Sequence, residues 1–199
     1  MKRSQFCKKL LAPAVVCGCT MNLQASGIPI GYKQSTGGNE TPCDEKMEFT
    51  HVWVKRFFDI VDQQLDEKTR YKLMQTNGEV CAKNAYGEIP SAVPATLEEI
   101  DQKIASWQQN VGKENISRQD NVIFYNYVGS PKGVKISDGY CLCPMIENGP
   151  ATVSPTYCQC SVGYVQYMFQ RYITFKPVKV ELLESVRSGV KACRFKVLL

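Results

Sequence analysis

The chain has 199 residues, of which 44% are apolar and 22% charged, and its formal net charge is +5. These values are those of one globular domain of ordinary size with a tail, and they exclude a disordered chain and an integral membrane protein. Lysine and arginine are interleaved with acidic residues instead of forming a dense basic stripe, so we expect no nucleic-acid partner. The unusual feature is the cysteine content: there are ten cysteines, and six of them follow residue 80.

Residues 1–25 have the pattern of a signal peptide. A basic start precedes a short apolar run over residues 10–19, which is too short to span a bilayer as a helix. Arg3, Phe6 and Lys8 also resemble a twin-arginine export signal, although only one of its two arginines is present. We therefore expect an exported protein of the periplasm or cell envelope with no transmembrane span, and a cytoplasmic location is the alternative.

The end of the signal-like segment and the linker after it are predicted to tether one folded domain. Gly18 and Cys19 resemble a lipoprotein processing box, so a lipid anchor at Cys19 is a further prediction. Residues 26–45 are rich in Gly, Ser, Thr and Pro without an apolar period, which is typical of a flexible linker. We expect residues 46–199 to form a single domain.

The first half of that domain is predicted to be helical. Asp66 is a good N-cap for a helix over residues 67–76. Gly78 should end this helix, which leaves Cys81 just beyond it. A capping box then opens a third helix of about four turns. The first helix, over residues 47–65, carries an apolar stripe that should face the core: Phe49, Trp53, Phe57, Val61 and Leu65.

The second half is predicted to be a sheet with one inserted helix. β-Branched and aromatic residues predict strands over residues 121–128 and 134–145, joined by a turn into a hairpin. Strands over residues 178–184 and 193–198 would complete an antiparallel sheet of about four strands. A helix over residues 162–172, inserted after Cys160, separates the two pairs. The sequence therefore predicts an α+β fold, with a helical front half packed on the sheet.

Two C-x-C pairs are the candidate functional residues. Cys141 and Cys143 would project from the same face of a strand, because side chains alternate along it. Cys158 and Cys160 would lie where the inserted helix begins. Unpaired amides and the positive end of the helix dipole favour a thiolate there. Both pairs could therefore contribute ligands to one site.

Four thiolates can close a tetrahedral metal site, with zinc as the first candidate and an iron–sulfur cluster as the second. Cys81 and Cys193 are additional candidate ligands. Disulfides within or between the pairs are an alternative, as is a reactive thiol at Cys158 or Cys160. Glu184 is the best placed acid or base for such chemistry.

Several C-terminal positions carry a resemblance to a known family. They are Gly163, Glu184, Ser185, Gly189, Cys193 and Phe195. With the cysteines before them they resemble the 4-vinyl reductase-type domain, and the stretch from Trp53 to Cys81 is similar to the front of an uncharacterised cysteine-rich bacterial family. The resemblance implies helices on one face of an antiparallel sheet, as in TRAPP-type and haem-nitric-oxide-binding relatives. It also implies small-molecule sensing, with a metal near the cysteines.

These observations predict an exported, metal-bound domain that binds a small-molecule ligand. The ligand would occupy an apolar pocket between helices and sheet, lined by Trp53, Phe57, Tyr164 and Met168. A more distant resemblance to 2-amino-thiazoline-4-carboxylate hydrolases makes a thiol- or zinc-dependent hydrolase of a small sulfur or nitrogen compound the second hypothesis. A disulfide-stabilised envelope protein without catalysis is the third. The sequence leaves the oligomeric state open, and a dimer is one state that it allows.

Overall fold

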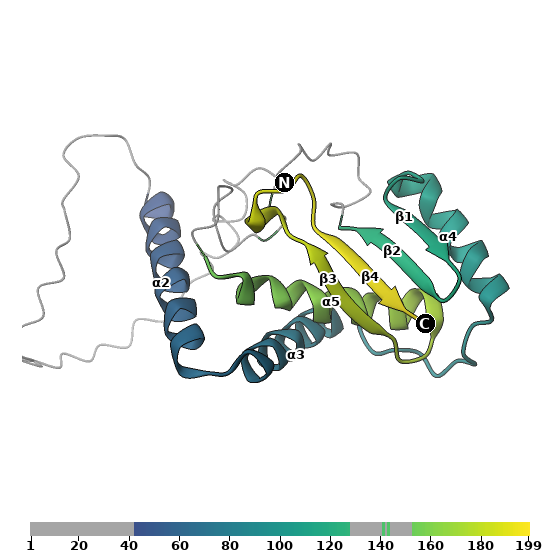
Figure 1. The fold of residues 1–199 in the computed structure, drawn as a ribbon, viewed down its shortest axis with the longest axis horizontal. Helices are drawn as coiled ribbons and strands as arrows, with labels where there is room; N and C mark the ends of the chain where they lie inside the picture. Colours follow the sequence, from purple (N-terminus) through teal and green to yellow (C-terminus); the bar gives the residue numbers. More distant parts are fainter. Residues whose placement is uncertain (1–41, 128–140, 142, 144–152) are drawn as a thin grey trace, which may run out of the picture. The chain divides into compact units, whose positions relative to one another are not determined.

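The computed structural model describes residues 42–127, 141, 143 and 153–199. The chain divides into two compact units, Met1–Phe49 and Thr50–Leu199. In the described residues no helix is long and apolar enough to cross a membrane. Helices precede most of the strands along the chain (Figure 1), in the order α2 (Pro42–Gln64), α3 (Glu67–Tyr86), α4 (Leu97–Val111), β1 (Ile116–Gln119), β2 (Val122–Asn126), α5 (Gln159–Phe169), β3 (Lys179–Glu184) and β4 (Arg194–Leu198).

The four strands form one antiparallel sheet, which confirms the predicted α+β class. Their order is β1-β2-β4-β3. Inward and outward side chains alternate along β2 and β4, so that Ile123 and Tyr125 are buried on one strand and Phe195 and Val197 on the other. This alternation gives the sheet one apolar face.

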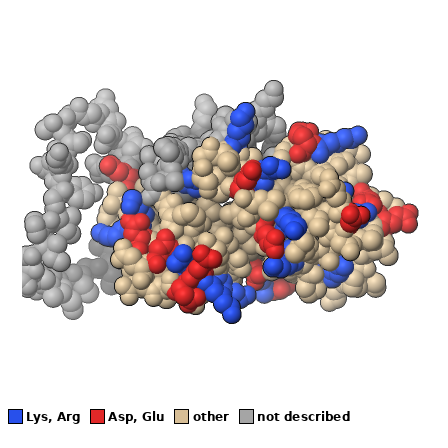
Figure 2. All heavy atoms as spheres, in the orientation of Figure 1, with Lys and Arg blue, Asp and Glu red and all other residues tan. Residues whose placement is uncertain are grey.

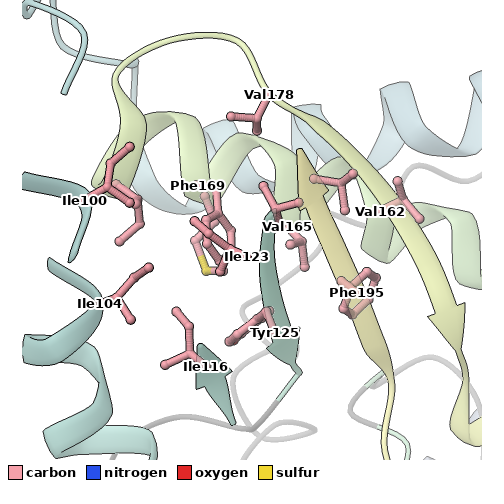
Figure 3. Close-up of a cluster of buried hydrophobic side chains, with 14 residues drawn as sticks. Ile100, Ile104, Ile116, Ile123, Tyr125, Val162, Val165, Phe169, Val178 and Phe195 are labelled. Carbon is pink, nitrogen blue, oxygen red and sulfur yellow. The ribbon is translucent and has the colours of Figure 1, made fainter. Parts of the chain in front are cut away.

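Helices α4 and α5 supply the other half of the core. Ile100 and Ile104 of α4 and Val165 and Phe169 of α5 are all buried. Figure 3 shows them converging with Phe195 and the other inward strand residues. The capping box predicted for the third helix is present, since Thr96 and Glu99 each bind the other's backbone amide. Local capping and apolar periodicity therefore account for α4.

Helix α3 is longer than predicted. It continues through Gly78 to Tyr86, and Gly87 caps it at a positive φ of 77°. The predicted end at Gly78 is wrong because this glycine serves a close helix crossing. A Cβ at Gly78 would collide with the backbone carbonyl of Cys160 at the start of α5, and a Cβ at Gly163 would collide with the carbonyl of Gln75. Tertiary packing here outweighs the helix-breaking tendency of an Asn-Gly pair.

The predicted hairpin has a different partner strand. β2 confirms the strand expected over residues 121–128, but it pairs with β1 on one edge and β4 on the other. Neither edge of β2 is left for residues 134–145, most of which lie outside the described residues. Cys141 and Cys143 are described and are not in a strand. β1 escaped prediction because its sequence, Ile-Ser-Arg-Gln, is short and mostly polar.

Helix α2 buries Val61 of the predicted stripe but leaves Trp53 and Phe57 of that stripe exposed. Val54, Phe58 and Val61 are buried, whereas Trp53 and Phe57 are 45% and 40% exposed. The rings of Trp53 and Phe57 stack on each other with centroids 5.2 Å apart. The buried face is set by the partner that it meets, because Phe58 packs edge-on against the ring of Tyr157 at 5.1 Å.

The surface carries mixed charge. Figure 2 shows Lys and Arg side chains beside Asp and Glu over the described part of the face in view. Ion pairs in the described part of the chain include Lys55 with Asp59 at 2.7 Å and Arg194 with Glu184 at 3.3 Å. Pairs as exposed as these contribute little to stability.

Candidate functional site

Five cysteines gather in and around a small apolar cluster that is separate from the main core. They are Cys141, Cys143, Cys158, Cys160 and Cys193, which we call the cysteine cluster. Their apolar neighbours come from several segments, and none of the five thiols is in a disulfide. These neighbours are Val54 and Phe58 of α2, Met74 of α3, Val153, Tyr157 and Val186.

Three of these cysteines lie near the short turn η3 (Val186–Ser188), which joins β3 to β4. Cys158 Sγ lies 3.1 Å from Ser185 Oγ, and the backbone N–H of Val186 donates to Cys193 Sγ at 3.5 Å. Burial raises the pKa of Cys158, and the nearby thiols of Cys193 and Cys141 raise it further. Cys158 and Cys193 thus both contact this turn or its cap, and Cys141 belongs to the apolar cluster that includes Val186.

The other two cysteines have hydrogen-bond partners outside η3. The side-chain amide of Asn77, on α3, donates to Cys160 Sγ at 3.7 Å. The thiol of Cys143 is hydrogen-bonded to the hydroxyl of Tyr157. Cys158 and Cys160 point in different directions because residues two apart in a helix are about 200° apart around its axis. The C-x-C pair at this helix therefore does not act as one two-ligand unit.

The helix that carries these cysteines begins earlier than predicted. A 3₁₀ turn, η1 (Pro155–Cys158), leads directly into α5, and the hydroxyl of Ser154 caps it by accepting from the N–H of Thr156. The N–H of Gln159 already donates to carbonyls of η1. Cys158 and Cys160 consequently lie inside a continuous helical stretch, where the first amides are no longer unpaired.

Burial keeps these thiols protonated. It raises the pKa of Cys158 from 9.0 to about 11, even though the hydrogen bond with Ser185 and the charge of Arg187 act in the opposite direction. Burial is also the main cause of the raised pKa of Cys160 and of Cys193. Desolvation therefore opposes the thiolate that was predicted at the helix start.

Polar groups that favour negative charge nevertheless surround the cluster. The side chain of Arg187 is buried, with 2% of its surface exposed, and its charge favours the thiolate form of Cys158. Burial raises the pKa of Tyr157, so its hydroxyl keeps its proton and can donate to Cys143. A cation and a hydrogen-bond donor thus lie near Cys158 and Cys143.

The predicted four-cysteine site is not assembled as the side chains stand. Within residues 42–127, 141, 143 and 153–199, no three His, Cys, Asp or Glu side chains are close enough to hold a metal ion. Cys81 is exposed on α3. Glu184 is exposed at the end of β3 and pairs with Arg194. The signal that could have placed Cys193 is strand alternation, because it precedes the buried Phe195 and Val197 by two and four residues.

The four predicted pocket residues lie in different surroundings. Trp53 and Phe57 are exposed on α2, whereas Met168 belongs to the main core. Tyr164 donates from its hydroxyl to that of Tyr86 at 2.7 Å. A ligand pocket between helices and sheet therefore stays a prediction.

Comparison with known proteins gives a family without an assigned activity. Residues 38–199 match DUF6144, a family of unknown function, and the chain belongs to this family. No curated protein matches the chain.

Proposed function

We propose that this member of the DUF6144 family binds a soft transition-metal ion, zinc first, through thiolates of the cysteine cluster other than Cys160. The central ligands would be Cys141, Cys158 and Cys193. The observation that carries the proposal is that Cys158 and Cys193 both contact η3 or its cap, that Cys141 belongs to the apolar cluster of Val186 in the same turn, and that none of the three is in a disulfide. Thiolate sulfur is the ligand that zinc and other soft ions take in structural sites.

A core of neutral thiols is the simplest competing interpretation, because buried cysteine behaves as a small apolar residue. The polar surroundings argue for the metal. A zinc ion with three or four thiolates carries a net charge of about −1 or −2. The guanidinium of Arg187 and the N–H of Val186 are groups that stabilise such charge. Neutral thiols would need neither the guanidinium nor the N–H group to stabilise them.

Binding would require the cysteine side chains to rotate toward one another. A zinc–sulfur bond is about 2.3 Å long, and a cysteine sulfur turns about a single bond to reach it. Cys143 is the candidate for the fourth ligand, since it is two residues from Cys141 and packs against the same apolar cluster. Each thiol that becomes a ligand releases its proton.

The proposal also includes small-molecule binding and export. Residues 1–25 and the resemblance to 4-vinyl reductase-type domains support these two parts. An iron–sulfur cluster is the alternative occupant, and its visible absorbance would distinguish it from zinc. Cell fractionation, with the mass of the mature N-terminus, tests export: a full-length chain in the cytoplasm would contradict it.

Metal analysis of the reduced protein tests the main claim. The full chain, purified from zinc-supplemented cells without chelator, should hold about one zinc ion per chain. Serine at Cys158 or Cys193 should lower that content severalfold, whereas Cys81→Ser, which changes an exposed thiol on α3, should leave it unchanged. Circular dichroism would show that each variant is folded. A folded wild-type chain that neither retains nor takes up zinc would overturn the proposal.

A further inference from the structure

Cys160 lies on α5 and Cys81 on α3, and these two helices cross closely. The two helices approach so closely that the backbone carbonyl of Cys160 lies against Gly78. Asn77, just before this glycine, donates to the sulfur of Cys160 at 3.7 Å. The start of α5 and the middle of α3 are therefore in direct contact.

Cys81 lies on the same side of α3 as these contacts. It follows Asn77 by four residues and Gly78 by three, and residues at these spacings are neighbours on a helix surface. On the α5 side, a Cβ at Gly78 would also meet the backbone nitrogen of Tyr164. Tyr164 is one turn beyond Cys160, so Cys81 faces this stretch of α5.

The two thiols differ in their access to solvent. Cys81 is exposed, whereas Cys160 is partly buried, and both are free. An exposed thiol reacts first with an oxidant in solution, and a sheltered neighbour can then resolve the product. This difference suits a pair with an attacking and a resolving cysteine.

We propose that Cys81 and Cys160 form a peroxide-oxidisable pair that closes into a disulfide between α3 and α5. In the first step the Cys81 sulfur attacks hydrogen peroxide: an S–O bond forms, the O–O bond breaks, and Cys81 sulfenic acid and water result. In the second step the Cys160 sulfur attacks the Cys81 sulfur. The S–S bond forms, the S–O bond breaks, and water leaves with the thiol proton. Overall, two thiols are oxidised by two electrons and peroxide is reduced to two water molecules.

The disulfide would fasten the two helices at their closest approach. The bridge closes the chain between residues 81 and 160, a long loop, and this restricts the unfolded state. Oxidation should therefore raise the thermal midpoint. A small thiol reductant can attack the exposed Cys81 sulfur, which makes the bond reversible.

The experiment is peroxide treatment of the reduced full chain, followed by maleimide alkylation, trypsin digestion and mass spectrometry. The tryptic peptide that contains Cys160 runs from residue 136 to 171 and also holds Cys141, Cys143 and Cys158. Variants must therefore assign the bond. We expect a peptide cross-linked to the one containing Cys81, lighter by two hydrogen atoms than its reduced parts. Cys158→Ser should keep the cross-link, and Cys160→Ser and Cys81→Ser should each abolish it.

The thermal midpoint gives a second measurement. Oxidation should raise it by several degrees in the wild type, dithiothreitol should reverse the rise, and Cys81→Ser should show neither change. A cross-link that survives Cys160→Ser, or Cys81 found as sulfinic acid with Cys160 unoxidised, would overturn the inference. The pair is separate from the proposed metal ligands at η3. Cys81→Ser should lose the disulfide and keep its zinc, so the failure of one proposal can be told from the failure of the other.

Discussion

Replacing Gly163 by alanine should destabilise the protein, although alanine is the better helix former. In an exposed helix the same change would stabilise by about 1 kcal/mol. Here the new Cβ would collide with the carbonyl of Gln75, and a backbone atom cannot rotate aside. Overpacking costs about 1–3 kcal/mol, and a collision with backbone belongs at the upper end of that range. The expected net loss is about 2 kcal/mol.

Urea unfolding followed by circular dichroism measures this loss, and thermal unfolding should show a midpoint lower by about 4–8 °C. Gly78→Ala, on the opposite side of the crossing, should behave in the same way. Asn84→Ala is the control, because Asn84 is exposed on α3 and only helix propensity should change there. If Gly163→Ala were as stable as the wild type, the two helices could not approach as closely as described.

Three further predictions concern charge and hydrogen bonding. Burial alone would raise the pKa of Asp62, but hydrogen bonds from Ser154 and Thr156 and the charge of Arg70 outweigh it and hold the pKa below its ordinary value. The ionised Asp62 carboxylate therefore stabilises the folded state fully above about pH 4, and this contribution is lost as pH falls through the lower folded pKa. The free energy of unfolding of Asp62→Asn, measured in urea, should therefore vary less between pH 5 and pH 3 than that of the wild type. Thr156→Val should cost about 1–3 kcal/mol in the same assay at pH 7, because Thr156 is buried and its hydroxyl donates to Asp62 at 2.6 Å; an unchanged midpoint would contradict this. Zinc affinity, measured by competition with a chelator between pH 6 and pH 8, should rise about tenfold per pH unit for each thiol that ionises on binding; an affinity independent of pH would count against ligation by Cys158 and Cys193.

The parts of the fold that follow from local signals could be predicted from the sequence. The capping box of Thr96 and Glu99 fixes the start of α4, and it works through atoms within one turn. Alternation of apolar residues likewise gave β3 and β4 to within about one residue at each end. Such signals need no knowledge of the partner segment.

The errors occurred where a distant segment decides the outcome. Gly78 has the local features of a helix end, but it continues the helix because α5 crosses there. The partner of β2 was taken to be the next apolar stretch, whereas the observed partner is the short polar β1 before it. Hydrogen bonds of a sheet do not depend on side-chain type, so a polar strand leaves little signal in the sequence.

The candidate site was predicted only in part for the same reason. Spacing along the sequence identified Cys158 and Cys160 as a pair, yet in a helix this spacing sends the two side chains to different sides. Cys158 faces η3 with Cys193, and Cys160 faces Asn77 on α3. The neighbours of each sulfur depend on the path of β3 and β4 and on the α3–α5 crossing. The C-x-C pattern contains no information about either.

The raised pKa of these thiols is compatible with metal binding once magnitudes are compared. The rise at Cys158 from 9.0 to about 11 makes ionisation roughly 3 kcal/mol costlier than for an ordinary cysteine. Structural zinc sites bind with apparent free energies of about 10–16 kcal/mol at pH 7. A penalty of this size at one or two ligands leaves most of that free energy, and the nearby Arg187 and backbone N–H of Val186 would recover part of it as the sulfur atoms become charged. Burial therefore keeps the thiols neutral in the absence of an ion without preventing them from becoming its ligands.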